Sequence, residues 1–119
     1  MPSLPLVFCI DLEPDRRITE RGARERPSGA DLFFPLVPRL RDHLAALSGG
    51  DAHLTWCLRM DPQIHNTYGS ADWLATVFEG ELDEQLCAGD ELGLHPHSWP
   101  WRDGGWVSDQ ADEASRTHC

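Results

Sequence analysis

Three short apolar runs alternate with two helical patterns in this chain, and that order constrains the fold more than any other feature. Residues 4–10, 53–60 and 91–95 are each long enough for one buried strand. Between them, apolar residues recur at helical spacing over residues 37–47 and again over residues 73–86. Strands separated by helices form parallel sheets with right-handed crossovers. We therefore expect an α/β fold of the order β-α-β-α-β with parallel strands.

The limits of the two helices follow from proline, glycine and serine. Pro35 and Pro38 suit the first turn of the first helix, and the Gly-Gly pair after Ser48 ends it. Residues 66–71 are expected to form a loop, in which Ser70 is a good N-cap for the second helix. That helix is expected to run unbroken to the glycine that precedes the third strand.

Polar pairs stand where the first and third strands end. Asp11 and Glu13 follow the first run, and His95 and His97 end the third. Residues i and i+2 of an extended segment share a face, and Pro96 favours an extended backbone at His95. Barrel enzymes keep their chemistry at the carboxyl ends of parallel strands. Two imidazoles and two carboxylates there predict a zinc-like site with a position left for water, although ordinary polar strand ends remain the alternative.

Further candidate residues surround this predicted site. Arg59 and Asp61 have the same spacing at the end of the second strand, and we expect them to reach the site as substrate-binding residues. Trp99 and Trp101 belong to a glycine-containing loop that can stack on a sugar or simply pack on itself. Residues 15–28, rich in arginine, are expected to form a solvated loop, with gripping an anionic substrate as the alternative.

Composition excludes several classes of partner. The 119 residues suit one domain, which we place at residues 1–106, followed by a frayed tail at 107–119. A net charge of −10 argues against a nucleic-acid partner, which requires a basic face. No apolar segment is long enough for a membrane span, and no signal peptide is visible. The four cysteines form no Cys-x-x-Cys pair, so we expect small buried apolar residues with free thiols in a cytoplasmic protein.

The motifs resemble those of the polysaccharide deacetylase family, the NodB-homology family of metal-dependent carbohydrate esterases. Residues 89–98 resemble the family's Gly-His-Glu-Ile-Gly-x-His-Thr-x-Ser-His stretch. Residues 53–58 resemble its second strand, and residues 8–13 resemble its Thr-Phe-Asp-Asp-Gly motif. The resemblance covers residues 4–100, so it implies the N-terminal half of the family's distorted (β/α) barrel.

The resemblance also implies roles for single residues. Asp11 takes the position of the catalytic base, and His95 that of the first metal-binding histidine. Leu12 occupies the second Asp position and Trp99 the second His position, so Glu13 and His97 stand in as metal ligands. The family's later motifs, including its general acid, have no counterpart here.

The implied function is a metal-dependent deacetylase-like hydrolase that acts on an N-acylated sugar, with zinc as the expected ion. Trp99 and Trp101 would line the sugar. A partial barrel also leaves an open sheet edge for self-association or for a complementing chain. Two alternatives stay open: another amidohydrolase-like metal hydrolase, and a non-catalytic half-barrel that binds metal or a partner. Whether the chain is an enzyme is therefore left undecided.

Overall fold

A three-stranded parallel sheet forms the centre of the computed structural model, which describes residues 6–15, 25–98 and 101–107. The strands are β1 (Cys9–Leu12), β2 (Thr55–Leu58) and β3 (Glu91–Leu94), in the order β1-β2-β3. The expected α/β fold with parallel strands is confirmed. The sheet is open, and no barrel closes within the described residues, so the likeness to a half-barrel stays a prediction.

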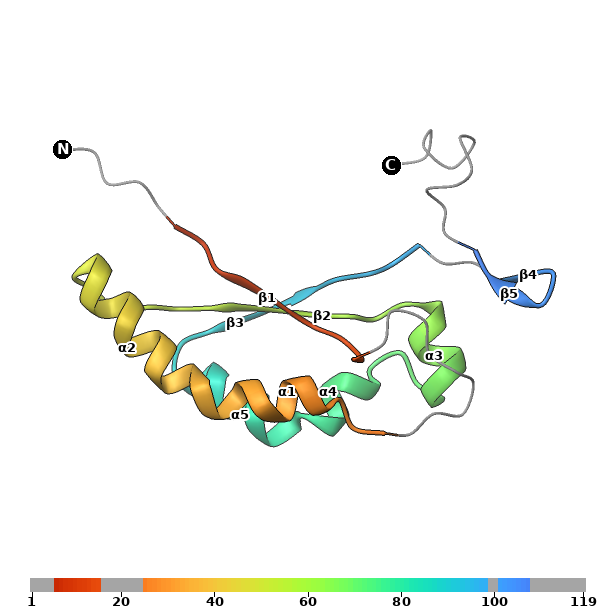
Figure 1. Ribbon diagram of the computed structural model, residues 1–119, viewed down its shortest axis with the longest axis horizontal. Helices are drawn as coiled ribbons and strands as arrows, with labels where there is room; N and C mark the ends of the chain where they lie inside the picture. The colour runs from red at the N-terminus through yellow and green to blue at the C-terminus, as the bar shows by residue number, and fades with distance from the viewer. Residues whose placement is uncertain (1–5, 16–24, 99–100, 108–119) are drawn as a thin grey trace.

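Helices make up both crossovers. The first contains α1 (Ser28–Phe33), the 3-10 turn η1 (Phe34–Leu36) and α2 (Val37–Ser48). The second contains α3 (Pro62–Tyr68), α4 (Trp73–Val77) and α5 (Glu79–Cys87). Helices α1, α2, α4 and α5 lie together on one side of the sheet (Figure 1). The described residues therefore form two layers, and the opposite face of the sheet, called the bare face below, carries none of these four helices.

The register explains which side chains meet the helices. Ile10, Trp56 and Leu92 are aligned across the three strands, and alternate residues of a strand point to opposite faces. Trp56 is buried, so this row faces the helical layer. The next row, Asp11, Cys57 and Gly93, consequently belongs to the bare face.

The core is built around Trp56. Its ring stacks on the ring of Phe34, with the centroids 4.9 Å apart. The ring centroid of Phe34 lies 5.4 Å from that of Phe78, which follows the last residue of α4. The buried cluster is formed by side chains in or next to β1, η1, α2, β2, α4 and α5: Leu12, Phe34, Val37, Leu54, Trp56, Leu58, Leu74, Phe78 and Leu82. Burial of this apolar surface is the main force that holds the helical layer on the sheet.

The third strand is less covered than the sequence predicted. Leu92 and Leu94 are 45% and 69% exposed, although they align with the buried Trp56 and Leu58. The expectation of a buried third strand is therefore wrong, because β3 is an outer strand of the sheet and its side chains are exposed or half-buried. Cysteine burial was also overestimated: Cys9 and Cys87 are exposed, and Cys57 is half-buried.

The second crossover differs from the expected loop and single helix. Residues 62–68 form α3, because Asp61 caps its N-terminus and Pro62 takes its first position. The expected unbroken helix is two helices, since Phe78 turns into the core between α4 and α5. The N-cap of α4 is Asp72, and Ser70 instead bonds the Asp72 carboxylate.

The expected loop around the tryptophans is partly a hairpin. Strands β4 (Trp101–Arg102) and β5 (Gly105–Trp106) pair antiparallel, and the rings of Trp101 and Trp106 meet edge to face at 5.1 Å. Trp99, residues 16–24 of the arginine-rich segment and residues 108–119 of the expected tail lie outside the described residues.

Candidate metal centre

The carboxyl ends of the three strands bring the predicted ligands together. The Arg59 amide donates to the Leu12 carbonyl at 3.0 Å, and the His95 amide donates to the Leu58 carbonyl at 2.8 Å. The parallel ladder thus continues one step beyond the regular strands, and Glu13, Arg59 and His95 follow them in line. Because Leu12 and Leu58 face the helical layer, these next residues point to the opposite face, where Arg59 is nevertheless buried beside Asp61 and Gln63.

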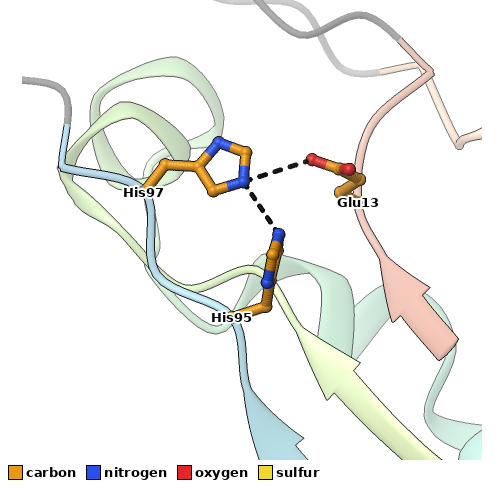
Figure 2. A group of neighbouring side chains, drawn as sticks. All are labelled: Glu13, His95 and His97. Carbon is orange, nitrogen blue, oxygen red and sulfur yellow. Dashed lines mark hydrogen bonds and ion pairs between the residues drawn. The ribbon is translucent and has the colours of Figure 1, made fainter. Parts of the chain in front are cut away.

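Glu13, His95 and His97 form the candidate metal centre (Figure 2). The Nε2 atoms of His95 and His97 lie 2.9 Å apart, and Nε2 of His97 lies 3.7 Å from Oε2 of Glu13. One possible ligand atom from each residue lies within 4.8 Å of the others. These three residues could therefore hold a metal ion.

The donor set fits a divalent ion of the zinc type. Two imidazole nitrogens and one carboxylate oxygen are common zinc ligands, and tetrahedral bonds near 2 Å separate such atoms by roughly 3.3 Å. The observed 2.9 and 3.7 Å separations bracket that spacing. Three protein ligands would leave a fourth position for water or a substrate oxygen.

The local electrostatics keep His97 available as a ligand. Burial lowers the pKa of His97, and the nearby Arg59 guanidinium lowers it further, while the carboxylate of Glu13 acts in the opposite direction. An imidazole must be neutral to bind a metal ion. A lowered pKa increases the neutral fraction of His97 near neutral pH.

Asp11 lies on the other side of His95. Its Oδ1 is 3.7 Å from Nδ1 of His95, and its side chain is 49% exposed. That separation is too long for a hydrogen bond, but it places a carboxylate behind the imidazole. Its predicted role as catalytic base stays a prediction.

Arg59 and Asp61 form a buried ion pair beside the site. Nε of Arg59 donates to Oδ2 of Asp61 at 2.6 Å, and both side chains are almost inaccessible to solvent. Arg59 also donates to Oε1 of Gln63, whose buried Nε2 has no hydrogen-bond partner in the described part of the chain. The sequence predicted the proximity of Arg59 and Asp61 to the site, whereas their contact with a substrate stays a prediction.

Two groups near the site were not predicted from the sequence. Gln63 was missed because residues 62–68 were not expected to be helical. The main-chain amide of His97, which donates to Oδ2 of Asp61 at 3.2 Å, was also missed. The Asp-Pro sequence at 61–62 could have indicated the helix, because Asp is a favoured N-cap and Pro a favoured first residue. Trp101 is half exposed in its hairpin, and its predicted contact with a sugar stays a prediction.

Comparison with family models, with curated proteins and with solved structures gives no match for this chain. Within the described residues, no helix has both the length and the apolar character needed to cross a bilayer. Any functional assignment therefore depends on the geometry of the site and on the motifs of the sequence.

Proposed function

We propose that this chain is a metal-binding domain of a deacetylase-like hydrolase, with an N-acylated sugar as its substrate class. The observation that carries the proposal is the convergence of Glu13, His95 and His97 at the carboxyl ends of β1 and β3. The substrate class comes from the resemblance of residues 89–98 to the polysaccharide deacetylase family.

Each residue of the site has a distinct task in this proposal. Glu13, His95 and His97 would hold the ion, which polarises an amide carbonyl and activates water when it is bound. Asp11 would accept a proton from the attacking water, as its position in the family motif implies. Its exposed carboxylate can exchange that proton with solvent.

The first test is the metal content of the purified chain. We expect about one zinc ion per chain, because three ligands with one open position are typical of zinc enzymes. The His95→Ala/His97→Ala double variant should lose the ion. The matched control is His43→Ala/His65→Ala, which removes two exposed helical histidines outside the cluster. Equal metal content in both double variants would contradict the assignment.

The second test is hydrolysis of an N-acetylated sugar by the metal-loaded chain. We expect slow turnover, because Asp11 supplies a base but no described residue supplies a proton to the leaving nitrogen. General acid catalysis typically contributes about 10²–10⁴-fold. Asp11→Asn should abolish the remaining activity while metal content is unchanged. Equal rates for the chain and for Asp11→Asn would refute the role of Asp11.

A non-catalytic metal-binding domain is the second candidate. The observation that favours it is the exposure of the site, where the side chains of Asp11, Glu13 and His95 are 49%, 35% and 33% accessible to solvent. Enclosure from water strengthens electrostatic catalysis, and these three side chains are not enclosed by the described part of the chain. Metal binding without any Asp11-dependent turnover would support this candidate over the hydrolase.

A further inference from the structure

Arg59 and Asp61, at the end of the central strand, contact both edges of the candidate metal centre. Asp61 Oδ2 accepts hydrogen bonds from Nε of Arg59 at 2.6 Å and from the main-chain amide of His97 at 3.2 Å. On the opposite side, Nη1 of Arg59 lies 3.8 Å from Oε2 of Glu13. The buried Arg59–Asp61 ion pair therefore contacts both Glu13 and the backbone of His97, which are two of the three candidate ligands.

The carboxylate of Asp61 is itself fixed in orientation. Its second oxygen, Oδ1, accepts from the amide of Ile64 at 3.0 Å and so caps α3. The Arg59 guanidinium is held in turn by Oε1 of Gln63. With both oxygens bonded inside the protein, the Asp61 side chain cannot rotate without losing several contacts.

The main chain at His97 needs such an anchor. Regular pairing of β3 ends at Leu94, and the His95 amide makes one further bond to β2. The amides of Glu91 and His95 donate to carbonyls of the central strand segment, so the next amide that faces that segment is the amide of His97. The bond from His97 to Asp61 takes the place of the next ladder bond.

We propose that Asp61, supported by Arg59, is a positioning residue of the metal centre. It fixes the backbone at His97, so that this imidazole meets His95 and Glu13 before an ion arrives. The inference rests on the proposed metal-binding function. Residues behind metal ligands typically change metal affinity by about 10–100-fold when they are replaced, because they orient the ligands.

The decisive variant is Asp61→Asn. Asparagine keeps the shape and can still cap α3 with its side-chain oxygen. Its amide nitrogen would then face two donors, Nε of Arg59 and the amide of His97. We expect zinc affinity, measured by competition with a chelator, to fall by about 10–100-fold. The visible spectrum of the cobalt-substituted chain should change as well, because the ligand geometry changes.

Two further variants separate positioning from general stability. Leu82→Ala opens a cavity under α5 and should destabilise the fold, yet the affinity of its folded molecules should equal that of the wild type. If Asp61→Asn fails to fold because the buried Arg59 charge has lost the Asp61 carboxylate, Arg59→Met/Asp61→Asn removes that charge too. The same loss of affinity is expected in this double variant.

Hydrogen exchange of the metal-free chain gives a readout that does not depend on metal. The His97 amide should be protected in the wild type and in Leu82→Ala, but exposed in both Asp61 variants. If the wild type binds no metal, the proposed function fails, while this measurement still decides the positioning role. Wild-type zinc affinity in a folded Asp61 variant, or equal His97 exchange in all variants, would overturn the inference.

Discussion

Asp90 ties three elements together through its carboxylate. Arg41 of α2 donates to both of its oxygens, at 2.6 and 2.8 Å, and the Leu54 amide and the Trp56 indole donate at 2.8 and 2.9 Å. Removing one partner of such a buried pair typically costs about 3–5 kcal/mol. Asp90→Asn should lower the free energy of unfolding, measured by urea titration, by about 3 kcal/mol. A loss below roughly 1 kcal/mol, the scale of an exposed pair, would contradict this account.

The same network predicts how acid destabilises the fold. Burial alone would raise the pKa of Asp90, but the hydrogen bonds from Arg41, Leu54 and Trp56 and the Arg41 charge lower it overall. A carboxyl whose pKa is lower in the folded state stabilises the fold above its unfolded pKa, near 4, and less as pH falls toward the folded value. Urea titrations below about pH 4 should therefore show a flatter pH dependence for Asp90→Asn than for the wild type. Equal slopes would exclude Asp90 as the group responsible.

The positions of single site residues could be predicted where strand geometry alone determines them. Glu13 and His95 meet because parallel strands end at the same edge and alternate residues share a face. The bond from His97 to Asp61 was not predictable, because it depends on the path of the backbone after pairing stops. The network of Asp90 was missed for a related reason: its partners lie far away in sequence.

At the scale of elements, the sequence predicted the order of strands and major helices but not their breaks. The pattern from Trp73 to Leu86 continues through Phe78, because an apolar residue there suits both a helix face and a core-facing turn. Helix α1 was not predicted, because the residues that stabilise it are distant in the sequence. Asp15 accepts from the Ser28 and Gly29 amides at its start, at 2.8 and 2.9 Å. Arg26 donates to Asp31 of α1 at 2.6 Å, and its guanidinium lies 4.2 Å from the centre of the Phe78 ring, between α4 and α5.

At the scale of the whole molecule, the one-sided sheet predicts association. Leu92 and Leu94 are exposed on the outer strand β3, and unpaired strand edges readily bind other strands. The radius of gyration, 17.0 Å, exceeds the roughly 13 Å of a compact domain of about 100 residues. We expect sedimentation at tens of micromolar to show dimers or larger species. Leu92→Lys/Leu94→Lys should shift the population toward monomer, and a wild type that sediments only as a monomer would refute the expectation.

The strand order has a consequence for the energetics of the whole sheet. Glu13 follows β1 and the two histidines follow β3, while β2 separates these strands and contributes no ligand. An ion bound by all three residues would crosslink the segment after β1 to the segment after β3. It would thereby close a long loop of chain at the carboxyl end of the sheet. Its binding free energy would then add to folding, by about 2.7 kcal/mol when free metal is 100 times its dissociation constant. Metal binding and the stability of the folded sheet would thus be thermodynamically coupled.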